Sequence, residues 1–240
     1  MKRRFHAVTS LLVILVTFFS GCAANRKMIN ERFRDLEGKE HLTVIMLGNA
    51  FYEPRWEAGT ASFMRGYMKS LLGEVTNSDV SVLNASLPED TFADIMRRVD
   101  MDIISYRPDI VFMMVGLFDS NRRGLSETTF REQVKELFSV FNKYGVFVVV
   151  LTSIGYRDAY YIADERILRL KEFNEMIVWE AGLHQLPVID VFGYVERLRQ
   201  TDHAEYQTLF KDQILLNDKG YDYVLSYVKN NITKAYRQRD

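Results

Sequence analysis

The stretch Leu42–Pro54, LTVIMLGNAFYEP, decides the fold class of this chain. An apolar run rich in β-branched residues stops at Gly48, and Asn49 and Ala50 follow before the chain turns away. Further runs of the same kind occur at 79–84, 109–116, 146–152 and 187–191. Several of these runs are apolar nearly throughout, which is typical of strands covered on both faces of a sheet.

Longer amphipathic segments alternate with the strands and predict helices. They span 57–72, 91–105, 127–144, 164–181 and about 219–236. Ser126 is the expected N-cap of the third, and Gly73 and Gly182 are the expected stops of the first and fourth. Strands that alternate with helices form βαβ units around a parallel sheet. The sequence therefore predicts one doubly wound α/β domain with five parallel strands.

The N-terminus reads as a secretory signal rather than as part of this domain. The basic residues Lys2–Arg4 precede an apolar stretch, 7–19, that is shorter than the roughly 20 residues needed to cross a bilayer. The string Phe19-Ser20-Gly21-Cys22 resembles a bacterial lipobox, in which the cysteine is lipidated. The alternative is that Cys22, the chain's only cysteine, is a buried structural residue.

The lipobox implies a division of the chain into three parts. We expect a signal peptide at 1–21, a lipidated N-terminus with a polar tether at 22–40, and the folded domain at 41–240. The protein would be held in the bacterial cell envelope, on the outer membrane facing the periplasm or on the outer face of the inner membrane. Its contact with the membrane would come from the acyl chains on Cys22.

The charge balance argues against nucleic acid as a partner. Cleavage after residue 21 removes three of the 31 basic residues and none of the 32 acidic ones, so the net charge falls from −1 to −4. A mildly acidic globule has no general attraction for a polyanion.

Four short blocks at the expected strand ends resemble the SGNH, or GDSL-type, hydrolase superfamily of esterases, lipases and acetylhydrolases. They are LGNAFYE, NASLPEDTFADIMRRV, VGLFD and KDQILLNDKGYDYV, within residues 42–236. The last is the most specific, because Asp212, Leu216, Asn217, Gly220 and Tyr221 fall in register. Asn174 and Asp190 also match the family's penultimate helix and fifth strand. The resemblance implies a flavodoxin-like, three-layer α/β/α fold.

The catalytic positions of the resemblance are replaced here. The family's nucleophilic serine falls on Ala50 and its histidine base on Leu215. Its oxyanion-hole glycine and asparagine fall on Glu89 and Phe118. Only the triad aspartate is retained, as Asp212. An alanine methyl has no lone pair to attack a carbonyl, and a leucine can neither accept nor return a proton.

The sequence therefore predicts a domain that binds an envelope glycan, an acylated sugar or a protein partner without cleaving it, and that needs no cofactor. The expected cleft rim consists of Asn49, Phe51, Ser86, Phe118, Asp119 and Asp212. The aromatic residues Phe51, Tyr52 and Trp56 could form a stacking wall for a sugar or acyl group, or simply pack the first loop onto the sheet.

Several alternatives stay open at this point. One is a divergent esterase with relocated catalytic residues, for example His203 with Ser86 or Ser120. Another is a purely structural role in an envelope complex. No metal is expected: carboxylates could converge at the strand ends, but neither a cysteine pair nor a His-x-x-x-His spacing accompanies them. The carboxylates concerned are Glu89, Asp119, Asp212 and Asp218.

Overall fold

The core of the protein is a five-stranded parallel sheet. The computed structural model describes residues 25–48, 58–159 and 164–237. The strands are β1 (His41–Leu47), β2 (Asp79–Asn84), β3 (Ile110–Met113), β4 (Phe147–Leu151) and β5 (Val188–Ile189). They pair in the order β2-β1-β3-β4-β5. This is the flavodoxin-like order, and it confirms the predicted fold class.

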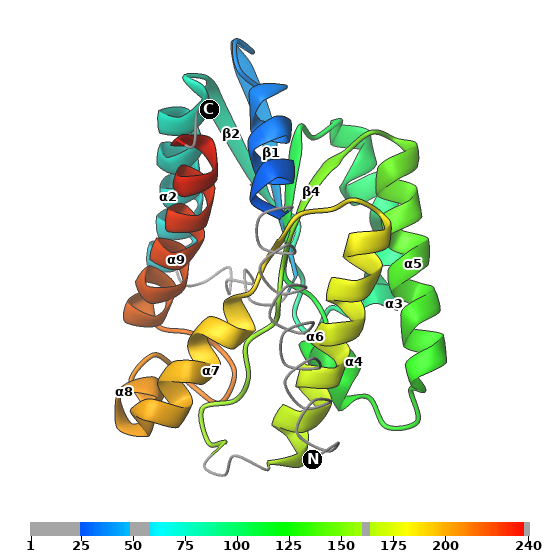
Figure 1. The fold of residues 1–240 in the computed structure, drawn as a ribbon, viewed down its shortest axis with the longest axis vertical. Helices are drawn as coiled ribbons and strands as arrows, with labels where there is room; N and C mark the ends of the chain where they lie inside the picture. The colour runs from blue at the N-terminus through cyan, green and yellow to red at the C-terminus, as the bar shows by residue number, and fades with distance from the viewer. Residues whose placement is uncertain (1–24, 49–57, 160–163, 238–240) are drawn as a thin grey trace, which may run out of the picture.

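Helices cover both faces of the sheet and complete the three layers (Figure 1). The described helices are α2 (Ala58–Thr76), α3 (Phe92–Asp102), α4 (Leu117–Asn121), α5 (Glu127–Lys143), α6 (Glu165–Leu183), α7 (Val191–Thr201), α8 (His203–Gln207) and α9 (Asp218–Arg237). Apolar side chains of α3, α5 and α6 pack on one face, and those of α2 and α9 pack on the other. Within the described part of the chain, no helix is both long and apolar enough to cross a membrane.

The helix boundaries confirm one predicted cap and correct two predicted stops. Ser126 caps α5 by accepting a hydrogen bond from the main-chain N–H of Thr129. Gly73 and Gly182 lie inside α2 and α6 rather than beyond them. The left-handed residues near these ends are Asn77 (φ 56°) and Gln185 (φ 55°). Asparagine can take this conformation at a helix end in place of glycine.

The segment predicted to be a polar tether is part of the fold. Residues 25–34 form a helix, called the N-terminal helix below, which stands beside the sheet in blue in Figure 1. Ile29, Phe33 and Leu36 are at most 5% exposed and belong to the core, and the Phe33 ring lies 5.4 Å from that of Phe147. The predicted boundary at residue 41 is therefore wrong for 25–36, because this apolar stripe packs onto the sheet.

Candidate functional site

Glycine is required at the carboxyl ends of both β1 and β3. Gly48, at the end of β1, has φ 111°, and a Cβ there would lie 2.1 Å from the carbonyl oxygen of Met114. Gly116, before α4, has φ 123°, and a Cβ there would lie 2.9 Å from Cδ1 of Ile177. The two turns that frame the candidate site therefore depend on glycine.

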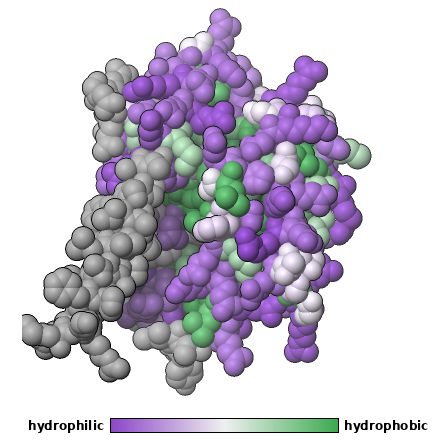
Figure 2. Space-filling model, turned by 45° about the vertical axis from the view of Figure 1, so that its right-hand side comes forward, coloured by the Kyte–Doolittle hydropathy of each residue, from purple (hydrophilic) through white to green (hydrophobic). Residues whose placement is uncertain are grey.

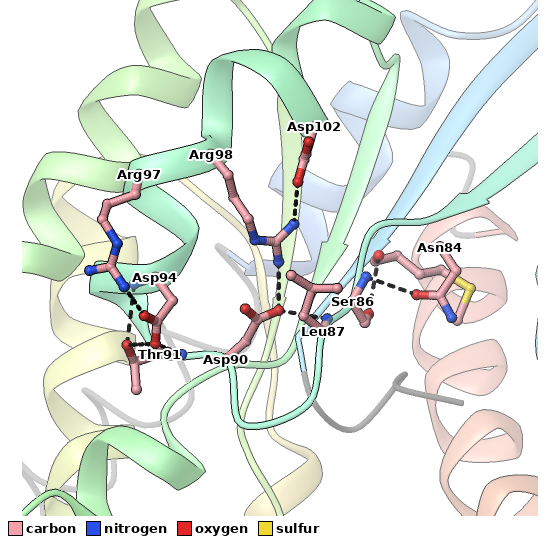
Figure 3. Close-up of polar contacts among 10 residues, drawn as sticks. Asn84, Ser86, Leu87, Asp90, Thr91, Asp94, Arg97, Arg98 and Asp102 are labelled. Carbon is pink, nitrogen blue, oxygen red and sulfur yellow. Dashed lines mark hydrogen bonds and ion pairs between the residues drawn. The ribbon is translucent and has the colours of Figure 1, made fainter. Parts of the chain in front are cut away.

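The loop between β2 and α3 is fixed by a buried ion pair (Figure 3). Asp90 is 2% exposed and accepts hydrogen bonds from the N–H of Leu87 (2.8 Å) and from Nη2 of Arg98 (2.6 Å). Burial raises the pKa of Asp90, and the two donors oppose that rise. Arg98 also reaches Asp102 at 3.0 Å. The loop therefore has little freedom to adapt to a ligand.

Glu89 lies at the tip of this loop in a conformation that favours glycine. Its φ is 59° and it is exposed. The resemblance places the family's oxyanion-hole glycine at this position. A residue with a Cβ costs about 1–2 kcal/mol in the left-handed region, so the glutamate carries backbone strain.

The serines predicted as possible nucleophiles donate to main-chain carbonyls. The Ser86 hydroxyl lies 3.4 Å from the carbonyl oxygen of Met46 at the end of β1. The Ser120 hydroxyl is buried and donates to Leu117 at 2.8 Å. His203 lies at the start of α8 with its ring against that of Tyr206, 5.8 Å between centroids. Both hydroxyls are therefore used as structural donors.

Asp119 lies inside the protein rather than on the predicted rim. It is 0% exposed, and its Oδ1 accepts a hydrogen bond from the N–H of Phe92 at 3.1 Å. Its Oδ2 is buried without a hydrogen-bond partner. Burial raises the pKa of Asp119 to about 7, with a further small rise from Asp94. This carboxyl ties α4 to the first turn of α3 and cannot contact a ligand, so the prediction that it lines the cleft is wrong.

Asp212 is used within its own loop. Its Oδ1 accepts hydrogen bonds from the N–H groups of Ile214 (2.9 Å) and Leu215 (2.8 Å). The side chain is exposed and closes a local turn. Asp212 thus fixes the backbone of the loop that carries Leu215. Because residue 215 is a leucine, there is no imidazole for the Asp212 carboxylate to orient.

Leu215 lines an apolar hollow at the carboxyl edge of the sheet. Its neighbours there include Met114, Leu117 and Ser153. The hollow measures only about 10 Å³, close to the space of a single water molecule. Among the described residues that line this hollow, only Ser153 has a buried side-chain polar atom, its hydroxyl oxygen, without a hydrogen-bond partner. The position expected to hold a base is therefore filled by apolar side chains.

Phe118 adds to this apolar filling. Its ring is half-buried against a small cluster formed by Leu117, Tyr156, Ala159, Ile167, Leu170 and Phe192. A phenyl ring supplies no N–H donor for a developing oxyanion. The loss of one such donor costs about 2.7–4 kcal/mol of transition-state stabilisation.

Solved structures with a similar fold include acetylxylan esterases and other hydrolases. An acetylxylan esterase from Geobacillus stearothermophilus superposes with a TM-score of 0.68 at 15% identity, over 85% of this chain and 98% of the enzyme. An α/β hydrolase from the metagenome of Lake Arreo, Spain, gives 0.67 at 17% identity, over 84% and 98%. The chain has the fold of the SGNH-type hydrolases. A lipase/acylhydrolase from Enterococcus faecalis, with a TM-score of 0.63 at 20% identity over 83% and 99%, is a further structure with this SGNH-type fold.

The sequence itself matches no described family and no curated protein. Because the identities to these solved structures are 20% or less, their similarity to this chain establishes its fold and not its activity.

Two side-chain interactions fix the chain just after β4, at the carboxyl edge of the sheet. Their residues were not among the predicted site residues. The amide of Asn174 accepts from the N–H of Ser153 and donates to its carbonyl, both at 2.9 Å. Thr152 donates to Asp190 at 2.9 Å. The sequence could have indicated these positions, because Thr152 and Ser153 are the first polar residues after the apolar run of β4.

A larger hollow, about 380 Å³, lies between the first turns of α5 and α6. Leu125, Leu168 and Phe173 form its apolar part, and Glu127, Ser126, Glu165, Arg169 and Glu172 complete the lining. Because the N-termini of crossover helices lie at the carboxyl edge of a parallel sheet, this hollow is on the same side of the molecule as the candidate site.

The remaining predicted site residues lie outside the described residues: Asn49, Ala50, Phe51, Tyr52, Trp56 and Cys22. Among the residues that are described, no three acidic, histidine or cysteine side chains gather in a way that could hold a metal ion.

Proposed function

We propose that this chain is a lipid-anchored protein of the bacterial cell envelope whose SGNH-type domain binds a ligand or partner without hydrolysing it. The observation that carries the proposal is the apolar filling around Leu215. The position where the resemblance expects an imidazole is a leucine that packs beside Leu117 and Met114. General-base activation of a nucleophile or of water requires a proton acceptor within hydrogen-bond reach.

The structures of the Geobacillus enzyme supply the comparison. Variants in which a serine or a histidine is replaced by alanine are described as catalytic mutants of that acetylxylan esterase. By the block resemblance, this chain carries Ala50 and Leu215 at the corresponding positions. It thus resembles a natural double replacement of the residues on which that esterase depends.

The ligand class that we favour is an acylated sugar of the envelope. The SGNH-type neighbours include enzymes named for acetylated xylan, so the fold accommodates a sugar that carries an acetyl group. A noncatalytic domain with this fold would bind an acetylated sugar, or a protein that carries an acetylated sugar. A divergent esterase is the second candidate, and the half-exposed Ser86 at the end of β2 is the observation that favours it.

An activity assay separates the two candidates. The purified, detergent-solubilised chain is incubated with p-nitrophenyl acetate and with a fluorophosphonate probe for nucleophilic serines, beside an acetylxylan esterase as positive control. We expect no turnover above the buffer blank and no covalent labelling. Labelling that is lost in Ser86→Ala would establish the esterase and refute the binding function. Calorimetric titration with acetylated and deacetylated xylo-oligosaccharides then tests the ligand class.

The lipid anchor has its own test. Mass spectrometry of the N-terminal peptide of the processed protein is expected to show a diacylglyceryl group on Cys22. A processed protein with an unmodified Cys22 would refute the anchor.

A further inference from the structure

The larger hollow, between the first turns of α5 and α6, combines an apolar surface with an acidic rim. Leu125, Leu168 and Phe173 supply the apolar side chains. Three exposed glutamates also line it: Glu127, Glu165 and Glu172. With a volume of about 380 Å³, it has room for a side chain of a binding partner. None of the described residues that line the small hollow beside Leu215 lines this one.

The negative charge of this rim is not neutralised by the described residues. None of the three glutamates forms an ion pair or accepts a side-chain hydrogen bond among them. The only basic residue of the described lining is Arg169. Its Nη2 donates to the carbonyls of Arg122 (3.3 Å) and Leu125 (3.1 Å), and its guanidinium lies 5.3 Å from the centroid of the Phe173 ring. Because Arg169 is used in this way, the hollow is complementary to a further cation on an apolar stem, as in lysine or arginine.

Apolar side chains continue from the hollow along the outward side of α6. Leu168, which lines the hollow, is 44% exposed, while Trp179 is 62% and Leu183 64% exposed. These three positions lie within about 60° of one another around the helix axis and extend over about 22 Å. The buried residues Leu170 and Ile177 are on the opposite side of the helix.

The surface around this stripe is mostly polar. Figure 2, which turns the right-hand side of Figure 1 forward, shows hydrophobic places within a largely hydrophilic surface. Large apolar side chains that are exposed along one side of a helix and bordered by charges are typical of protein interaction sites.

The charges on α6 argue against a second copy of this chain and against a lipid surface as the occupant. Glu172 and Glu175 lie between the apolar ends of the stripe, and among the described residues only Glu175 of the two has an ion-pair partner, Lys171 at 3.8 Å. A symmetric pairing of α6 with itself would bring these carboxylates together. Anionic lipid headgroups would be repelled by them. A protein segment with lysine or arginine between apolar side chains is complementary to both the apolar and the acidic parts.

We propose that the larger hollow and the stripe Leu168, Trp179 and Leu183, together called the α6 docking face, bind an amphipathic helical segment of a partner protein that carries lysine or arginine among apolar side chains. The basic side chain enters the hollow, where its stem packs on Leu125 and Leu168 and its charge meets the three carboxylates. Apolar side chains of the segment cover Trp179 and Leu183. The α6 docking face acts whether or not the candidate site hydrolyses an ester.

Fluorescence anisotropy with a defined peptide tests the α6 docking face. The probe is a fluorescein-labelled peptide of about 15 residues, mostly alanine, with leucine along one side of the helix and lysine within that side. The full chain is held in phosphatidylcholine nanodiscs, and empty nanodiscs are the blank. We expect the lysine peptide to bind and a peptide with glutamate in place of each lysine to stay free. In Trp56→Phe, which leaves Trp179 as the only tryptophan, the lysine peptide is expected to shift the emission to shorter wavelength.

Matched charge variants separate the hollow from the overall acidity of the protein. The test variant carries Glu127→Gln, Glu165→Gln and Glu172→Gln. It removes three charges and keeps the side-chain shapes, and we expect the Kd of the lysine peptide to rise at least about tenfold. The control variant removes three exposed acidic charges that do not line the hollow, by Glu132→Gln, Glu136→Gln and Asp100→Asn. Its Kd is expected to stay within about twofold of that of the unaltered chain.

A second pair of variants tests the apolar stripe. Trp179→Ala is expected to raise the Kd of the lysine peptide about tenfold, because exposed tryptophans at interfaces contribute much of the binding energy. Met101→Ala, at a position that is also exposed and apolar but lies on α3, is the control and should leave the Kd unchanged. Circular dichroism shows that each variant is folded.

Four results would overturn the proposal. Equal weakening in the two charge variants would show attraction to the acidic protein as a whole, and an unchanged Kd in Trp179→Ala would remove the stripe from the interface. Tighter binding of glucosamine oligomers than of the lysine peptide would assign the hollow to an amino sugar. A dimer of the free chain that Trp179→Ala dissociates would assign the stripe to a second copy. None of these results depends on ester hydrolysis or on Cys22, so they leave the proposed function standing.

Discussion

Replacement of Asp119 by asparagine tests the buried carboxyl most directly. In the folded protein Asp119 is fully buried, with Oδ1 bonded to the N–H of Phe92 and Oδ2 unpartnered. Burial raises its pKa from the ordinary value of 3.8 to about 7, while Arg122 opposes the rise. Asparagine keeps the acceptor for Phe92 and has no charge to bury.

The sign of the effect follows from proton linkage. Below about pH 4 the carboxyl is neutral in both states, so its burial carries no charge penalty. As the pH rises, the unfolded chain releases the proton first, and the folded protein releases it only near pH 7. The free energy of unfolding therefore falls as pH rises through this window and levels off above it. A tenfold change in proton affinity corresponds to about 1.4 kcal/mol, so the full effect is roughly 4 kcal/mol, of which about 3 kcal/mol falls between pH 5 and pH 8.

Urea unfolding followed by circular dichroism at pH 5, 6, 7 and 8 measures this effect. We expect Asp119→Asn to gain about 3 kcal/mol relative to the unaltered chain between pH 5 and pH 8. Asp100→Asn, at an exposed position on α3, is the control and should show no such trend. Parallel stability curves for Asp119→Asn and the unaltered chain would refute the reasoning, because they would mean that the folded and unfolded states release this proton at the same pH.

Substitutions at three further sites, two of them with control variants, test other features by the same unfolding measurement. Glu89→Gly is expected to stabilise the protein by about 1 kcal/mol by relieving the left-handed backbone, whereas Glu89→Ala should bring no gain; equal effects of the two would exclude strain. Phe33→Ala is expected to cost about 3–5 kcal/mol and Arg32→Ala less than about 0.5 kcal/mol, while a free tether would make both neutral. Asn174→Ala is expected to cost about 2–3 kcal/mol, since both main-chain groups of Ser153 lose their partner, and an unchanged midpoint would show that water replaces the amide.

The layers of the fold were predictable because the strands are buried on both faces. The run 146–151 is apolar throughout, and this composition is typical of strands covered on both faces of a sheet. The helices α4, α7 and α8 were not predicted. Of these, α4 and α8 are five-residue helices and have too few turns to show a periodic apolar face. The N-terminal helix could have been found, since Ile29, Phe33 and Leu36 have helical spacing within a charged run.

The burial of the carboxylates at the candidate site was not predictable from the sequence. A sequence block places Leu215 where the resemblance expects a base, and a leucine side chain can neither accept nor return a proton. The sequence does not show that Asp119 is enclosed while Asp212 stays exposed, because both are short acidic side chains in blocks that the resemblance places at the candidate site. Which carboxylate points inward depends on the packing of α3 and α4, and that packing is a long-range property.

The hydrogen bonds between the side chain of Asn25, at the start of the N-terminal helix, and the main chain of Val188 join residues 163 positions apart in the chain. Contacts of such sequence separation are slow to form, because a long loop must close before they stabilise anything. An exported chain emerges with its N-terminus first, so the earliest residues of the mature protein must wait for nearly all the others. On the proposed lipid anchor, the enzyme that modifies Cys22 would therefore meet its substrate while the first helix is still undocked.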